Sequence, residues 1–256
     1  MILWVYEVYR LMQKQPGKNY ELIPCATPEE VAALAAKAWL NEIEIANRLK
    51  APHDVALSGG RITQKFLAAA VEQSKSRNIS LSQVNFFWAD ERCVPPTDAQ
   101  SNFKLVNDGL FGPLKISPDK IHRLRGEAGP EAGAKEAEAE IRRVVGPNAH
   151  GQPVLDLIFL GLGEDGHVAS LAPDEPETMT TDPAVYRGVH NFAKPPPKRI
   201  TIGYQTIAAA RQVWMLASGS GKEQAFRDSL APNGKTSFAR VLRLRTGTRI
   251  YSDIGN

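Results

Sequence analysis

Apolar residues at helical spacing alternate with short, continuous apolar runs along this chain. The first clear helix begins after Thr27, where Thr-Pro-Glu-Glu supplies an N-cap hydroxyl, a proline at the first helical position and Glu30 three residues beyond the cap. Apolar positions from Val31 to Leu49 then recur with a helical period. This spacing predicts a helix that runs to about Lys50.

The same alternation continues to the end of the chain. A strand over residues 54–58, two glycines and a helix through Ala70 come next. Further strands are predicted over 84–89, 154–162, 200–202, 212–218 and 248–252, and further helices over 101–111, 131–145, 222–230 and 237–245. A turn is predicted over 90–99 and a long loop over 172–198. Strands that alternate with helices predict an α/β fold, with a mostly parallel sheet covered by helices on both faces.

The composition of the chain limits the kinds of protein that it can be. The chain has 256 residues, of which 43% are apolar and 23% charged, as in globular proteins. Its formal net charge is only +3 and the basic residues are spread out, so a nucleic-acid partner is not expected. Two cysteines, Cys25 and Cys93, make neither a metal-ligand pattern nor a disulfide framework, which indicates a reducing compartment and therefore the cytoplasm.

The first residues form an extension of uncertain structure over 1–20, ahead of a domain over 21–256. The opening residues are apolar, but Glu7 and Arg10 interrupt them and no small-residue cleavage site follows, so a signal peptide is not indicated. No run approaches the ~20 apolar residues that a membrane span needs. No membrane association is expected.

Ligands of open α/β sheets bind beyond the carboxyl ends of the strands, so the residues after each strand carry the candidate chemistry. The first such segment is Ser58-Gly59-Gly60-Arg61, with Thr63 two residues further on. Glycines let the backbone approach an anion, and the helix that follows presents free N–H groups to a phosphate. A plain strand-to-helix turn that needs a left-handed residue explains the two glycines alone better, and Arg61 and Thr63 shift the balance slightly towards an anion site.

The second segment is Asp90-Glu91-Arg92, which follows the strand over 84–89. An arginine can hold a phosphate or a carboxylate with two parallel hydrogen bonds, and the neighbouring acids could orient it. A helix cap with a local ion pair is the alternative explanation of these three residues.

The third segment, from Gly161 to His167, follows the most continuous apolar strand and reads Gly-Leu-Gly-Glu-Asp-Gly-His. It has the glycine spacing of a dinucleotide-binding turn, but Pro173 and Pro176 stop the long helix that such a turn requires. His167, flanked by Asp165, can take a proton from water and return it to a leaving oxygen. A structural histidine satisfied by its neighbours remains the alternative.

Together these segments resemble the 6-phosphogluconolactonase family, which belongs to a larger group with the glucosamine-6-phosphate deaminases. The resemblance runs from about Glu21 to Ile254, and it rests on ALSGG, WADERCVPP with SNFKLVNDGLF, LDLIFLGLGEDGHVASLAP, AKPPPKRITI and ARVLRLRTGTRIYSDI. It implies a single domain with a modified Rossmann-like topology. It also implies an enzyme that hydrolyses 6-phosphoglucono-1,5-lactone, a phosphorylated sugar lactone, with no metal and no organic cofactor.

The resemblance also implies roles for particular residues. His167 would be the general base that activates water, with Asp165 and Arg92 as the other catalytic candidates. Cations on Arg92, Lys194 and Arg199 would serve the phosphate or the developing oxyanion, without a division of labour between them. The substrate-binding candidates are Ser58, Gly59, Gly60, Arg61, Thr63, Asp90, Gly163, Lys194 and Arg199. One departure affects the phosphate end: family members often carry Ser-Thr-Pro-Lys after the glycines, where this chain has Arg61-Ile62-Thr63-Gln64.

Three other functions compete with lactone hydrolysis. An amino-sugar-phosphate deaminase or isomerase typically has tyrosine after the Asp-Glu pair and Ala-Phe-Asn-Glu after Asp-Gly-His, where this chain has Arg92 and Val-Ala-Ser-Leu. A non-catalytic sugar-phosphate sensor would bind ligand but lose nothing on substitution of His167. A nicotinamide-dependent dehydrogenase comes last. The protein is expected to act as a monomer or a small homo-oligomer.

Overall fold

A computed structural model describes residues 19–255 of the chain, so most of the predicted extension lies outside the described residues. Its centre is a six-stranded sheet in which every neighbouring pair is parallel, in the order β1-β9-β8-β5-β2-β3. These strands are β1 (Tyr20–Pro24), β2 (His53–Leu57), β3 (Val84–Trp88), β5 (Leu157–Gly161), β8 (Gln212–Ala217) and β9 (Thr248–Ser252). The predicted parallel sheet is confirmed.

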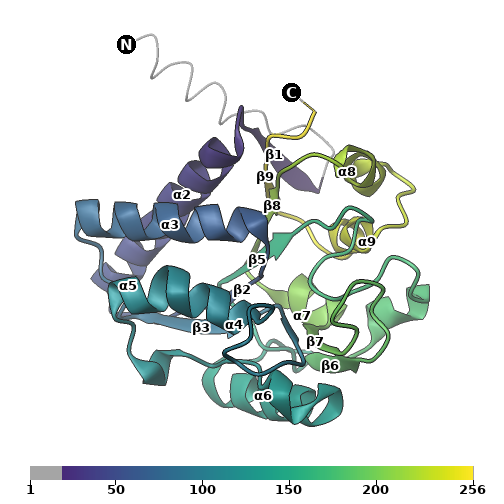
Figure 1. Cartoon of the computed structure of the whole chain (residues 1–256), viewed down its shortest axis with the longest axis horizontal. Coiled ribbons are helices and arrows are strands. Elements are labelled where there is room, and N and C mark those ends of the chain that lie inside the picture. Colours follow the sequence, from purple (N-terminus) through teal and green to yellow (C-terminus); the bar gives the residue numbers. More distant parts are fainter. Residues whose placement is uncertain (1–18, 256) are drawn as a thin grey trace.

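Helices cover both faces of this sheet, as predicted (Figure 1). On one side lie α2 (Pro28–Leu49) and α3 (Arg61–Arg77), and on the other α7 (Tyr204–Ala209), α8 (Glu223–Leu230) and α9 (Ser237–Leu244). The predicted cap of α2 is confirmed, because the Thr27 hydroxyl accepts a hydrogen bond from the Glu30 N–H at 3.1 Å. The helix ends where Lys50 takes a left-handed conformation, at φ 51°.

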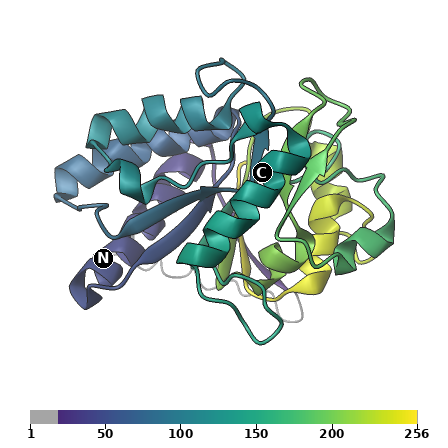
Figure 2. The same ribbon diagram turned by 90° about the horizontal axis from the view of Figure 1, so that it is seen from below.

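A second, smaller sheet is antiparallel and has the order β4-β7-β6. Its strands are β4 (Asp90–Arg92), β6 (Tyr186–Val189) and β7 (Arg199–Ile202), and α6 (Pro130–Val144) packs against it (Figure 2). Two expectations were therefore wrong. The segment over 90–99 begins with a strand, and the loop over 172–198 contains β6 and a 3-10 helix, Glu177–Thr181. Neither strand shows an apolar run, because β4 is fully charged and β6 is only four residues long.

The remaining helices and strands begin or end at residues that differ from the predicted ones. The helix expected over 101–111 is α4 (Asn102–Val106) followed by a π-helical turn, Asn107–Phe111, and α5 (Gly112–Leu114). Short 3-10 turns follow at Pro118–Lys120 and Gly126–Ala128. The sequence analysis missed β1 and α7, and it ended α3 too early and began β5 too early. Among the described residues, no helix is both long and apolar enough to cross a lipid bilayer.

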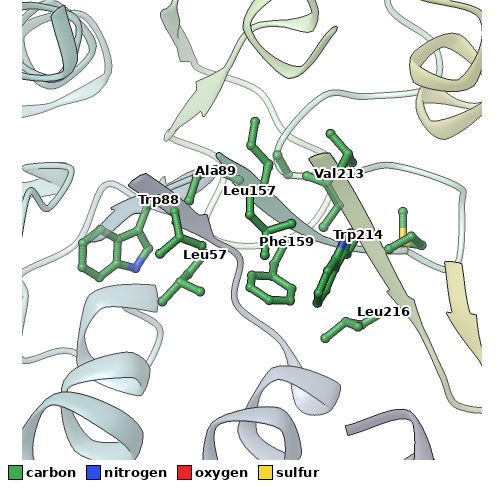
Figure 3. Packing of buried hydrophobic residues seen from close by; sticks show 14 of the residues in the cluster. Leu57, Trp88, Ala89, Leu157, Phe159, Val213, Trp214 and Leu216 are labelled. Atoms are coloured by element: carbon green, nitrogen blue, oxygen red, sulfur yellow. The ribbon is translucent and has the colours of Figure 1, made fainter. Parts of the chain in front are cut away.

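Aromatic rings fill the space between α2, α3 and the large sheet. Trp39 of α2 is fully buried and lies 5.5 Å from Phe66 and 5.7 Å from Phe159, between ring centroids. Its Nε1 donates a hydrogen bond to Nε2 of His53 at 3.2 Å. Phe159 also meets Trp214 edge to face at 5.6 Å (Figure 3). This packing fixes the central strands whose carboxyl ends carry the site.

We expect Trp39→Ala to lower the free energy of unfolding by about 3–5 kcal/mol, because it opens a cavity and leaves His53 without its donor. Urea denaturation followed by circular dichroism measures this loss. Leu49→Ala on the same helix is the control, because Leu49 is 71% exposed and its truncation should change stability by no more than about 0.5 kcal/mol. Equal losses for the two variants would contradict the packing described for Trp39.

Candidate active site

One pocket lies at the carboxyl ends of the central strands β8, β5, β2 and β3, where an open α/β sheet places its ligand. Nine of the predicted site residues line it: Ser58, Gly59, Gly60, Arg61, Asp90, Arg92, Gly163, His167 and Arg199. Five further residues complete the lining: Ile62, Gly161, Leu162, Ala169 and Lys222. The structure therefore brings the three predicted segments together in one place.

The glycine turn after β2 is held open by its neighbours. The Ser58 hydroxyl donates to the carbonyl of Phe159 on β5 at 2.7 Å. A Cβ on Gly59 would lie 1.9 Å from Oδ1 of Asn102, so only glycine fits there. Gly60 has φ +113°, a conformation that glycine adopts without strain, and it leads directly into α3. The backbone can therefore approach an anion at the start of this helix.

Thr63 does not reach the pocket. Its side chain is buried, and its hydroxyl donates to the Gly59 carbonyl one turn back at 3.0 Å. Thr63 therefore supports the glycine turn from within α3.

In the Asp90-Glu91-Arg92 segment, Asp90 and Arg92 line the pocket, whereas Glu91 does not. The buried Glu91 carboxylate accepts hydrogen bonds from the N–H groups of Asn102 and Phe103, both at 2.8 Å, and from the Ser101 hydroxyl. Burial raises the pKa of Glu91 above its ordinary value, although these hydrogen bonds oppose the rise. Glu91 therefore caps α4, as the alternative interpretation of this segment predicted.

Arg92, the next residue, turns toward the pocket. Its Nη1 donates to the Gln100 carbonyl at 2.6 Å, which anchors the side chain. Its Nε is buried and has no hydrogen-bond partner among the described residues. Arg92 lines the pocket, so its guanidinium supplies positive charge to an anionic ligand there.

Asp90 and Arg199 form a buried pair on the pocket wall. The Asp90 carboxylate accepts from the Ser170 hydroxyl at 2.7 Å and from the Asn102 amide at 3.0 Å, and its Oδ2 lies 4.0 Å from Nη1 of Arg199. Burial lowers the pKa of Arg199 from its ordinary value, and the charge of Asp90 opposes this shift. The carboxylate thus compensates the charge of a cation that is almost fully enclosed.

Most donors of Arg199 are used within the protein. Nε donates to the Pro196 carbonyl at 2.9 Å, and Nη2 to the carbonyls of Lys194 and Pro195. Nη1 donates to Ser170 at 3.3 Å, and one of its two hydrogens remains for a ligand. Arg199 therefore holds the proline-rich segment against the pocket and can offer a single hydrogen bond.

His167 is oriented on two sides. Its Nδ1 lies 2.5 Å from Oδ1 of Asp165, and its ring forms a T-shaped pair with Phe192 at 5.1 Å between ring centroids. Burial raises the pKa of the Asp165 carboxyl, but the hydrogen bond from His167 and the nearby positive charges outweigh it, so the pKa lies below the ordinary value. Asp165 contacts His167 without lining the pocket itself.

The sequence analysis missed one cation of the pocket, Lys222. It follows β8 and the turn Gly219-Ser220-Gly221, so the strand-glycine-helix pattern that drew attention to Ser58 also occurs here. Lys194 was predicted but does not line the pocket; its Nζ lies 4.0 Å from Asp165. Among residues 19–255, no group of three or more His, Cys, Asp or Glu side chains could hold a metal ion.

A carboxylate only accepts hydrogen bonds, so Nδ1 of His167 carries the hydrogen and Nε2 is left to accept a proton. Arg92, Arg199 and Lys222 place positive charge around the same pocket. These features define a class of α/β proteins that bind a small anionic ligand beside a histidine able to transfer protons.

A family model described as "Glucosamine-6-phosphate isomerases/6-phosphogluconolactonase" matches residues 26–250. The match covers most of the chain, and the chain therefore belongs to this family. The resemblance inferred from the sequence motifs is confirmed.

Relatives with assigned names agree with this membership. The chain is 33% identical over 221 residues to a protein of Streptomyces coelicolor named 6-phosphogluconolactonase, and the alignment covers 84% of each chain. It is 35% identical over 169 residues to 6-phosphogluconolactonase of Treponema pallidum, covering 66% of this chain and 68% of the relative.

Solved structures of other proteins share the fold of this chain. The 6-phosphogluconolactonase of Trypanosoma brucei superposes with a TM-score of 0.77 at 25% identity, covering 92% of this chain and 97% of that one. A monomeric glucosamine-6-phosphate deaminase superposes with a TM-score of 0.76 at 21% identity, covering 91% of this chain and 96% of that one. The latter similarity shows that the fold is shared.

We expect Gly163→Ala to lower the hydrolysis of 6-phosphogluconolactone, the substrate named for the relatives, by about 100-fold, because misplacing a catalytic group by about 1 Å has effects of this size. A Cβ at this position would lie 2.1 Å from Nδ1 of His167 and 2.6 Å from Oδ1 of Asp165, so the imidazole must move. Initial rates with freshly prepared lactone test this. Gly146→Ala is the matched control, because no atom lies within 4 Å of its added Cβ. Full activity of Gly163→Ala would contradict the packing around His167.

Proposed function

We propose that this protein hydrolyses 6-phosphoglucono-1,5-lactone to 6-phosphogluconate in the oxidative branch of the pentose phosphate pathway. The observation that carries the proposal is the position of His167, which is oriented by Asp165 and shares one pocket with Arg92 and the Gly59-Gly60 turn. The names of the relatives at 33% and 35% identity support the same substrate.

In the proposed reaction, Nε2 of His167 removes a proton from a water molecule as the water oxygen attacks the lactone carbonyl carbon. A tetrahedral intermediate forms, with negative charge on the former carbonyl oxygen. When the carbonyl is restored, the bond to the ring oxygen breaks, and His167 returns its proton to that oxygen. The products are a carboxylic acid, which ionises, and a free hydroxyl on the opened sugar. Asp165 stabilises the imidazolium form of His167 between the two proton transfers.

The cations of the pocket have two tasks in this reaction. One is to stabilise the oxyanion of the intermediate, which requires donors already in place before the charge develops. Arg199, with one remaining N–H, is the proposed donor to this oxyanion, and Arg92 is proposed to hold an oxygen that the substrate already carries before the reaction. The other task is to bind the phosphate, which we assign to the turn before α3 together with Arg61 and Lys222. In this assignment, Arg61 provides the charge that the family pattern places on a lysine.

A deaminase or isomerase activity is less well supported. Its typical tyrosine is replaced by Arg92, and its Ala-Phe-Asn-Glu segment by Val-Ala-Ser-Leu after His167. The structural similarity to a glucosamine-6-phosphate deaminase concerns the fold. We also propose that the enzyme acts in the cytoplasm, as the cysteine content predicts, and as a monomer or small homo-oligomer.

We expect His167→Ala to retain its fold and to lower the rate of enzymatic lactone hydrolysis by at least about tenfold, since a positioned general base contributes roughly 10²–10⁴-fold. The assay couples freshly generated 6-phosphogluconolactone to detection of 6-phosphogluconate and subtracts spontaneous ring opening. His150→Ala is the control, because His150 is exposed and lies outside the pocket. Unchanged turnover in His167→Ala would exclude His167 as the general base.

We expect Arg92→Ala chiefly to raise the Michaelis constant for the phosphorylated lactone, because it removes a cation that lines the pocket. A loss of roughly tenfold corresponds to one charge-assisted hydrogen bond. Arg142→Ala provides a matched loss of charge on α6, outside the pocket. A Michaelis constant equal to that of the unaltered protein would rule out contact between Arg92 and the substrate.

A further inference from the structure

Cations from separate segments surround the carboxylate of Glu164, which lies between the strand β5 and His167. Nη2 of Arg61, at the start of α3, lies 3.9 Å from Oε1, and Nζ of Lys194, on the proline-rich segment, lies 3.9 Å from Oε2. The Cγ of Glu164 lies near the turn after β8, 3.9 Å from where a Cβ on Gly221 would be. Lys222 follows this turn directly.

The charge of Glu164 also acts on Lys222. Burial lowers the pKa of Lys222 from its ordinary value, and the positive charges of Arg61 and Lys194 lower it further. Glu164 opposes these effects. The carboxylate therefore compensates part of the repulsion between Lys194 and the two pocket cations, Arg61 and Lys222.

Glu164 attracts Arg61 and Lys194 by its charge and forms no hydrogen bond with either of them. Both measured distances exceed hydrogen-bond length, and the side chains of Glu164 and Arg61 are 56% and 80% exposed. Ion pairs as exposed as these contribute little free energy, so a second anion can replace the carboxylate. A phosphate monoester carries more negative charge than a carboxylate and has three acceptor oxygens.

We propose that Glu164 is an internal competitor for the phosphate group of the substrate, and that the ligand must displace its carboxylate from Arg61 and Lys194. This inference rests on the proposed function. Without ligand, the carboxylate keeps the cations together at the phosphate end. With ligand, the interactions lost by Glu164 are subtracted from the phosphate affinity. Because substrate and product carry the same phosphate, this weakening favours release of 6-phosphogluconate after each turnover.

Glu164→Gln tests the proposal because it removes the charge and preserves the shape. We expect the Michaelis constant for the phosphorylated lactone and the inhibition constants for 6-phosphogluconate and inorganic phosphate each to fall about fivefold, the scale of an exposed ion pair. The Michaelis constant for unphosphorylated glucono-1,5-lactone should not change. Thermal melting checks that the variant remains folded.

Glu72→Gln is the matched control, because the substitution makes the same change in net charge. Glu72 is exposed on α3, more than two helical turns beyond Arg61. It should alter none of these constants. In an Arg61→Gln background, the effect of Glu164→Gln should shrink, because one of the cations for which the two anions compete is gone. An undiminished effect would show that Glu164 acts elsewhere.

Weaker or unchanged binding of phosphate by Glu164→Gln would overturn the proposal, because the carboxylate would then support the cations without competing for them. Calorimetric titration with inorganic phosphate measures this binding without any turnover. If the unaltered protein fails to hydrolyse the lactone, the proposed function falls, while the titration still decides the role of Glu164.

Discussion

The buried carboxylate of Asp90 joins the parts of the chain that make the pocket. It accepts hydrogen bonds from Asn102, whose side chain lies against Gly59, and from Ser170, three residues after His167. It also balances the charge of Arg199 on β7. Removing a charge from water is unfavourable unless its partners replace the lost hydration, so these contacts must form together. The pocket therefore has its shape only when the small antiparallel sheet is docked on the large one.

This dependence gives the small sheet a role in the chemistry. Its strands β4 and β7 carry Arg92 and Arg199 into a pocket whose floor belongs to the large sheet. The segment before β7 carries Phe192, whose ring lies between the guanidinium of Arg199, at 4.1 Å, and the imidazole of His167. Contacts between segments that are far apart in the sequence therefore position His167 and the cations. The backbone next to His167 is not enough to place these groups.

The sequence predicted those parts of the fold and the site that depend on local pattern. Buried parallel strands produce continuous apolar runs, and the rule that ligands bind at their carboxyl ends leads directly to Gly59, Arg92 and His167. The short strands β4 and β6 carry no such pattern, and contacts such as that of Ser170 with Asp90, 80 residues away, are created only by folding. Lys222 could have been found, because the same rule applied after β8 points to its turn.

The strand order has a consequence for how the chain matures during synthesis. Among the described strands, β1 lies at an edge of the large sheet and pairs only with β9, with Tyr20 opposite Thr248. Of the described strands, β1 is synthesised first and β9 last, so β1 gains this partner only after the strands between them have been made. Pairing across so long a stretch of chain slows folding, and until β9 has been synthesised β1 lacks this partner and is open to recognition by chaperones.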